Sequence, residues 1–93
     1  MDNIQAYLDK LGIDKEGYWS EDRNTYIIPL ADSDEFARVY TKLDNADWLF
    51  LYDGELSLLE ESSSLLFLND DVNFTLKSDF INNKYSLEVR EEQ

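Results

Sequence analysis

The stretch DWLFLYDGELSLLE, residues 47–60, carries the strongest local folding signal in this chain. An Asp-Gly pair between two apolar runs is the preferred two-residue turn of a β-hairpin. A turn at Asp53-Gly54 places Leu51 opposite Leu56 in neighbouring strands. Both faces of this strand pair are apolar near the centre, as is typical of strands deep inside a sheet. The stretch therefore predicts a central, buried hairpin.

Two helices are predicted from apolar residues at a spacing of three and four. The first covers residues 2–11, with Gly12 well placed to end it in a left-handed conformation. The second covers residues 32–43, and Asp32 and Glu35 form a capping-box pattern at its start. Both helices are expected to bury one apolar stripe.

The remaining apolar runs predict strands. Residues 17–20 and 25–28 flank the polar turn 21–24, and Pro29 is expected to end the second of these strands. Leu65-Leu66-Phe67-Leu68 is a further apolar run, and an exposed edge there would also support a homodimer through strand pairing.

The last two strands are predicted to pair across a two-residue turn at Asn82-Asn83. Val72-Asn73-Phe74-Thr75-Leu76-Lys77 alternates apolar and polar residues, so Val72, Phe74 and Leu76 are expected to point inward. The turn places Leu76 opposite Val89.

The predicted order is α-β-β-α-β-β-β-β-β. Successive hairpins favour an α+β fold with a mostly antiparallel sheet of about five to seven strands and two short helices packed on one face. A chain of 93 residues suits one compact domain, 1–93, with residues 89–93 expected to fray.

Composition narrows the function classes. Twenty-one acidic residues against eight basic ones give a formal net charge of −13 and a pI near 4.1. Such a surface repels nucleic acid and anionic lipid and attracts basic partners. The chain has no cysteine, no apolar run long enough to span a membrane and no signal-peptide pattern at its start, which predicts a cytoplasmic protein. The resemblance described below implies that this cytoplasm is that of a bacterial host cell.

Catalytic and metal chemistry are both disfavoured. The absence of histidine and cysteine excludes a Ser-His-Asp or Cys-His nucleophile and a Cys/His zinc site. Asn69, Asp71 and Asn73 have the spacing of the first calcium ligands of an EF-hand, but Phe74 and Phe80 occupy the positions that require glycine and glutamate. We therefore expect no enzyme activity, no cofactor and no metal.

One charge pattern favours binding. Between Lys42 and Lys77 there is no basic residue, whereas ordinary surfaces mix both signs. The acidic residues of this segment form two clusters in the predicted hairpin, one at the turn and one at the opposite end, beside aromatic residues. Two such clusters can match the spacing of the cationic side chains that hold phosphates. The predicted partner-binding residues are Asp44, Asp47, Asp53, Glu55, Glu60, Glu61, Asp70, Asp71, Trp48 and Tyr52.

The chain resembles the small acidic phage-encoded anti-CRISPR proteins that imitate DNA. The shared features are small size, a mixed α and β build, the lack of cysteine and a single-sign acidic stretch, here residues 43–76. The resemblance implies an inhibitor that occupies the basic DNA-binding surface of a CRISPR nuclease complex, such as the channel that reads the protospacer-adjacent motif, and blocks target binding. The partner is then a basic nucleic-acid-binding protein, with no direct contact to nucleic acid or membrane.

Two alternatives use the same residues. An immunity protein or antitoxin would neutralise a basic toxin nuclease, with Trp48, Tyr52 or Trp19 as buried anchors in place of the charges. A scaffold or regulatory domain would have no connection to nucleic acid, and its binding would depend little on salt.

Overall fold

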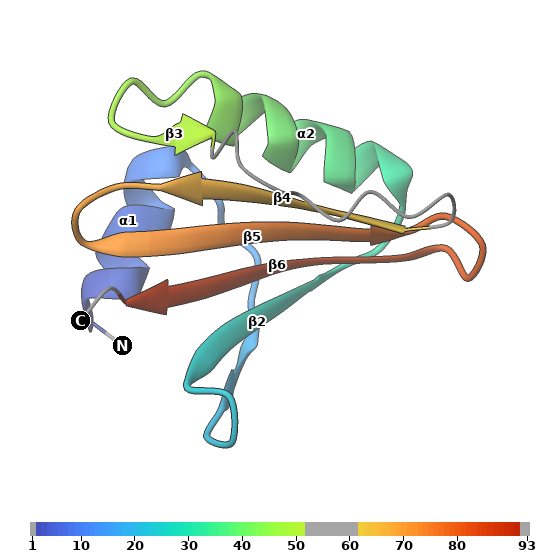
Figure 1. Cartoon of the computed structure of the whole chain (residues 1–93), viewed down its shortest axis with the longest axis horizontal. Coiled ribbons are helices and arrows are strands. Elements are labelled where there is room, and N and C mark those ends of the chain that lie inside the picture. The colour runs from blue at the N-terminus through green and yellow to red at the C-terminus, as the bar shows by residue number, and fades with distance from the viewer. Residues whose placement is uncertain (1, 52–61, 92–93) are drawn as a thin grey trace.

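The computed structural model describes residues 2–51 and 62–91. The helices are α1 (Asp2–Leu11) and α2 (Ser33–Asp44), and the strands are β1 (Tyr18–Ser20), β2 (Thr25–Leu30), β3 (Phe50–Leu51), β4 (Ser62–Leu68), β5 (Val72–Asp79) and β6 (Lys84–Glu91). All six strands form one antiparallel sheet in the spatial order β1-β2-β6-β5-β4-β3 (Figure 1). The predicted α+β fold is confirmed. The fourth of the seven predicted strands, within residues 55–59, lies outside the described residues.

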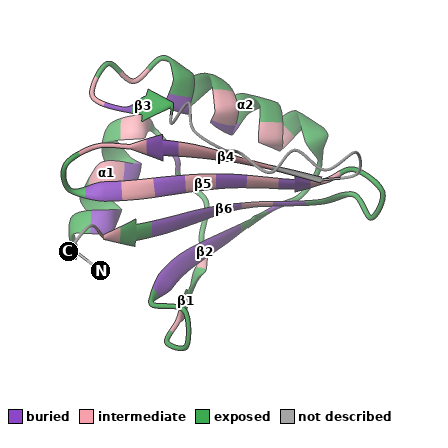
Figure 2. Ribbon diagram, in the orientation of Figure 1, coloured by how far each residue is buried: buried purple, intermediate pink, exposed green. Residues whose placement is uncertain are grey.

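The core lies between one face of this sheet and the two helices. Along β5 every second residue is buried, and Val72, Phe74 and Leu76 have no exposed surface, as the alternating pattern predicted (Figure 2). Ile4 and Leu8 of α1 pack into the same cluster, together with Val39 and Leu43 of α2. We call this the inner face. The opposite, outer face of the sheet has no helix over it among the described residues.

α1 has the predicted bounds, and α2 lies one residue later than the predicted range 32–43. The backbone N–H of Glu35 donates to Asp32 Oδ1 at 2.9 Å, which makes Asp32 the N-cap of α2. The Glu35 carboxylate accepts from the N–H of Ala31 at 2.7 Å, one residue earlier than a standard capping box requires. Gly12 has a φ of +76°, and the N–H of Ile13 donates to the carbonyl of Leu8 at 2.9 Å to close α1.

The predicted register of β5 and β6 is wrong by two residues. Leu76 pairs with Leu87, not with Val89, because the connection is a four-residue loop, 80–83. A two-residue loop of the favoured type needs positive φ at both positions, whereas here only Asn83 has it, at +51°. The Asp79 carboxylate fixes the longer loop by accepting from the backbone N–H and the side-chain amide of Asn82, at 3.1 and 2.8 Å.

The prediction of a buried central hairpin is also wrong in its placement. Among the described residues β3 is the last strand of the sheet, and Phe50 and Leu51 are 71% and 43% exposed. Leu51 pairs with Phe67 of β4, and its predicted partner Leu56 lies outside the described residues. The turn at 53–54 lies outside the described residues. A local apolar pattern identified the strand but not its neighbour, because edge and central strands share such patterns.

Three smaller predictions need correction. β2 does not end before Pro29 but continues through it, and Pro29 pairs with Ser86 of β6. The pairing of β1 with β2 stops at Ile27, so Pro29 lies where β1 does not pair with β2 and its missing N–H removes no bond to β1. β6 continues to Glu91, so residues 89–91 are not frayed. The apolar run 65–68 is not an edge along its whole length, because β3 pairs with residues 67–68.

Neither α1 nor α2 is long and apolar enough to cross a membrane.

A close approach of the backbone makes Gly17 a test of the β1–β2 pairing. A Cβ at this position would lie 2.2 Å from the carbonyl oxygen of Ile27, and the Gly17 N–H donates to the hydroxyl of Tyr26 at 2.9 Å. We expect Gly17→Ala to lower the free energy of unfolding by about 1–3 kcal/mol, the usual cost of overpacking. Urea denaturation would measure it. The neighbouring exposed variant Glu16→Ala should change stability by less than about 0.5 kcal/mol, and equal effects of the two substitutions would contradict this packing.

Candidate functional site

Two of the predicted acids occupy the tight turn between β4 and β5. The Asn69 side-chain oxygen accepts from the N–H groups of Asp71 and Val72 at 2.7 and 2.6 Å, and the Asn69 N–H donates to the Val72 carbonyl at 3.1 Å. An Asn side chain in this role replaces backbone turn contacts. The turn therefore holds Asp70 and Asp71 in fixed positions at the end of the sheet.

Tyr7 of α1 connects this turn to the segment before β3. Its hydroxyl donates to Asp71 Oδ2, and its ring lies 5.3 Å from that of Trp48, centroid to centroid. Figure 1 shows α1, the chain leading into β3 and the β4–β5 turn at the same end of the molecule. The structure thus brings together Asp47 and Trp48 with Asp70 and Asp71, and Asp44 ends the helix that leads to them. We call this surface, Asp44, Asp47, Asp70 and Asp71, the acidic end.

Three of these carboxylates are available to a partner. Asp44, Asp47 and Asp70 are exposed and make no hydrogen bond or ion pair with any residue in 2–51 or 62–91. Two basic residues lie beside this surface. Lys10 lies over the Trp48 ring, 4.9 Å from its centroid, and Lys42 lines the same shallow pocket as Asp47.

Trp48 is packed more tightly than a free binding anchor would be. Its ring is half-buried and meets Phe74 of the core edge-on, at 6.2 Å between centroids. Trp19, the other tryptophan considered as an anchor, lies on β1 and is 37% exposed. The other predicted site residues fall outside the described residues: Tyr52, Asp53, Glu55, Glu60 and Glu61.

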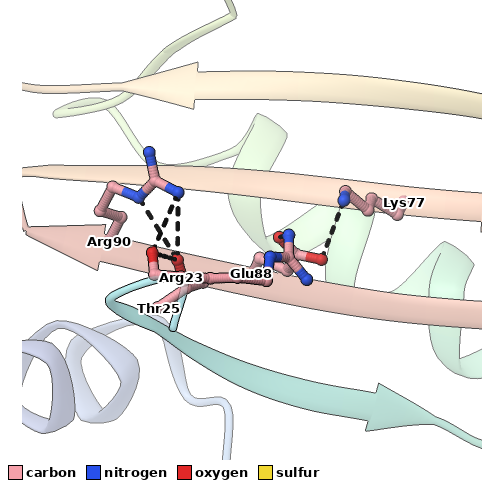
Figure 3. A network of polar contacts seen from close by, with 5 residues as sticks. All are labelled: Arg23, Thr25, Lys77, Glu88 and Arg90. Carbon is pink, nitrogen blue, oxygen red and sulfur yellow. Dashed lines mark hydrogen bonds and ion pairs between the residues drawn. The ribbon is translucent and has the colours of Figure 1, made fainter. Parts of the chain in front are cut away.

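The basic residues are concentrated elsewhere. Four of the eight basic residues of the chain lie on or over the outer face of the sheet: Arg23, Lys77, Lys84 and Arg90. Two of them contact the Glu88 carboxylate, which accepts from Arg23 and lies 3.0 Å from Lys77 Nζ (Figure 3). Glu88 is only 8% exposed, and the two cations neutralise the charge that would otherwise be costly to bury. On the helical side, Lys15 pairs with Glu35, and Lys42 donates to the carbonyl of Gly12.

An exposed apolar pair forms a second candidate surface that the sequence analysis missed. Phe80 and Ile81, in the loop between β5 and β6, are 53% and 61% exposed. Phe80 is supported from behind by the rings of Phe36 and Tyr85, at 6.3 and 5.9 Å. We call Phe80 and Ile81 the apolar tip. Figure 1 places this loop at the opposite end of the sheet from the acidic end. The adjacent Phe80 and Ile81 could have indicated this surface, but the turn predicted at Asn82-Asn83 placed the residues before it in a strand.

The described residues contain no group of three or more His, Cys, Asp or Glu side chains arranged to hold a metal ion. Two carboxyl groups have perturbed acidities for structural reasons. The Ala31 N–H and Lys15 lower the pKa of Glu35, and the side chain and backbone of Asn82 lower the pKa of Asp79. A carboxyl group whose pKa is lowered by folding stabilises the folded state at any pH above the pKa that the group has in the unfolded chain. This contribution disappears as the pH falls through the lowered pKa. They fit a helix start and a loop, which are structural roles.

No known protein family matches this sequence, and no curated protein and no solved structure matches the chain. The function must therefore be argued from the surfaces described above.

The contact between Tyr7 and Asp71 can be tested by titration. The Asp71 carboxylate accepts the phenol proton and repels the phenolate, so it raises the pKa of Tyr7. We expect Asp71→Asn to lower the pKa of Tyr7 toward its ordinary value. The ¹³Cζ shifts of the tyrosines report this, and Tyr7→Phe assigns the signal. Asp70→Asn removes the same charge from the next residue and should leave the pKa of Tyr7 nearly unchanged; the same titration curve in both variants would rule out the contact.

Proposed function

We propose that this protein is an acidic inhibitor that binds the basic nucleic-acid-binding surface of a partner protein by DNA mimicry. In its sharpest form, it is an anti-CRISPR protein that blocks target DNA binding by a CRISPR nuclease complex. The observation that carries the proposal is the separation of charge. Half of the basic residues lie on or over the outer sheet face, while Asp44, Asp47 and Asp70 of the acidic end are exposed and have no hydrogen-bond or ion-pair partner among residues 2–51 and 62–91.

The turn and helix contacts support a rigid anionic surface. Asn69 and Tyr7 hold the turn that carries Asp70 and Asp71, and rigid presentation lowers the entropy lost on binding. DNA-binding proteins hold phosphates with lysine and arginine side chains in fixed positions. Carboxylates in fixed positions can bind the same cations, which is the basis of mimicry.

In this proposal the binding free energy is shared among many carboxylates. A single exposed ion pair contributes only ~0–1 kcal/mol. An inhibitor of this type must therefore engage many acids at once, and one charge removed alone should have a mild effect. The affinity should fall as salt rises, as it does for DNA itself.

Charge reversal at the acidic end tests the proposal. We expect Asp47→Lys with Asp70→Lys to weaken binding to a guide-loaded nuclease complex about tenfold or more, since two attractive contacts become repulsive. The assay is electrophoretic detection of the complex on target DNA, titrated with inhibitor at two salt concentrations. A panel of nuclease complexes of different types would identify the target.

The matched control is Glu16→Lys with Asp22→Lys, two exposed acids remote from the acidic end with the same change in net charge. It should inhibit like the unmodified protein. Equal loss in both double variants would mean that only the overall charge acts. If the unmodified protein reduced target-DNA binding by none of the nuclease complexes, the anti-CRISPR role would be wrong.

The apolar tip favours a second candidate, an immunity protein or antitoxin that neutralises a basic toxin nuclease. Tightly bound interfaces depend on a few apolar anchors surrounded by polar residues. Phe80 and Ile81 form such a pair, and Asp79 lies directly beside them in the chain. In this candidate the tip, and not the acidic end, supplies most of the affinity.

Truncation of the tip separates the two candidates. If a toxin nuclease is the partner, Ile81→Ala should weaken binding by about 2 kcal/mol, or about thirtyfold, and reversal at the acidic end should matter less. Calorimetric titration with the catalytically inactive nuclease measures both. Phe50→Ala, which truncates an exposed aromatic residue on β3, is the control and should bind normally. A normal affinity of Ile81→Ala would reject the tip as the anchor.

A further inference from the structure

The strand β1 forms the end of the sheet opposite to β3. Its residues 18–20 pair with residues 25–27 of β2, and no strand within 2–51 or 62–91 pairs with its other side. Figure 2 shows β1 outside β2, away from the other strands. Along such an edge the backbone N–H and C=O groups of every second residue point away from the sheet, and they can pair with a further strand.

Two exposed aromatic side chains lie on this edge strand. Tyr18 is 55% exposed and Trp19 is 37% exposed. Neither ring stacks on another aromatic ring or on a cation among the described residues. Adjacent residues of a strand point to opposite faces, so an added strand would find one ring on each face. Aromatic rings pair well with β-branched side chains on a neighbouring strand.

Acidic residues flank β1 on both sides. Two exposed acids precede the strand and two follow it: Asp14, Glu16, Glu21 and Asp22. The basic residues of the same stretch are engaged within the protein, because Lys15 pairs with Glu35 and Arg23 pairs with Glu88. The local charge at both ends of the edge strand is therefore negative, and it favours a basic partner.

The acids also argue against a second copy of this chain as the partner. If two copies paired antiparallel about Trp19, Glu16 of one copy would lie opposite Asp22 of the other, and both ends of the pair would repel. Short edge strands and flanking charges are common devices against such self-association. They do not account for two exposed aromatic rings on the same strand, which a protected edge does not need.

We propose that β1 binds an extended segment of another protein as an additional strand, and that this segment carries lysine or arginine on both sides of a β-branched stretch. Backbone hydrogen bonds along the edge would supply affinity, as in other complexes formed by strand addition. Tyr18 and Trp19 would cover the central residues of the segment, and the flanking acids would contact its cations. The inference goes beyond the inhibitory function proposed above, because it uses a different surface and a different partner.

The probe is the synthetic peptide KKVTVTVKK, which has β-branched residues at its centre and cations at both ends. Two peptides are its matched controls. EEVTVTVEE reverses every charge, and KKVTPTVKK keeps every charge but contains a proline, which cannot donate to a strand ladder. Each is titrated into the full chain at physiological salt and followed by amide NMR spectra and hydrogen exchange.

We expect KKVTVTVKK to cause saturable amide shifts and slower hydrogen exchange at residues 18–20. The proline peptide should bind about tenfold more weakly, the difference expected when a ladder hydrogen bond is lost. The acidic peptide should not bind measurably, because its charges meet the acids that flank β1.

Crossed double variants separate this edge from the acidic end. Glu16→Lys with Asp22→Lys should weaken KKVTVTVKK binding about tenfold or more, since attractive contacts become repulsive. Asp47→Lys with Asp70→Lys changes the net charge equally and should bind this peptide normally. The inhibition of a nuclease complex is expected to show the opposite order, so failure of one proposal is distinguishable from failure of the other.

An aromatic pair of variants completes the test. Tyr18→Ala should weaken peptide binding about two- to fivefold, whereas Phe50→Ala, which truncates an exposed ring on β3, should not. Unchanged amide shifts away from the substitution confirm folding, and Tyr18→Thr replaces Tyr18→Ala if that variant is not folded. The proposal is overturned if KKVTPTVKK or EEVTVTVEE binds as tightly as KKVTVTVKK, if residues 18–20 show no saturable shift, or if both double variants lose the same affinity.

Discussion

The pairing of β5 with β6 is the contact on which the rest of the molecule depends. Eight residue pairs join these strands, and on the inner side Phe74, Leu76, Leu87 and Val89 have no exposed surface. The helices contact this ladder directly, α1 through β6 and α2 through both strands. Removing this apolar surface from water supplies the driving force that orders the helices, which are too short to be stable alone.

The same ladder determines the outer face. Because side chains alternate along a strand, the residues between the core positions of β5 and β6 point away from the helices. They include Asn73, Lys77, Glu88 and Arg90, which line a groove on the outer face. The outer face thereby takes up half of the basic residues, and the helices and turns are left with a large acidic surplus. The separation of charge on which the proposed function rests is thus a consequence of strand periodicity.

The same periodicity explains why the error in the β5–β6 register did not disturb the predicted core. The register of β5 and β6 was wrong by two residues, yet Val72, Phe74 and Leu76 point inward as predicted, because a shift of two positions leaves each side chain on its own face. The loop length decided the true register, and it depends on the Asp79–Asn82 contacts, which no local preference for an Asn-Asn turn reveals. The central hairpin failed for a different reason. Its apolar residues predicted burial, but within residues 2–51 and 62–91 β3 pairs with β4 alone, and Phe50 and Leu51 are exposed.

By itself the sequence determined the local features: the two helices with their caps at Asp32 and Gly12, the first hairpin, the inward face of β5, and an excess of negative charge. These depend on residues a few positions apart, whose contacts are short-range. Only the tertiary structure decided which strand lies at the edge, that Tyr7 joins Asp71 to Trp48, and that Arg90 and Asn73 meet across two strands. Such contacts join residues far apart in the chain, and they form only once the sheet order and register are set.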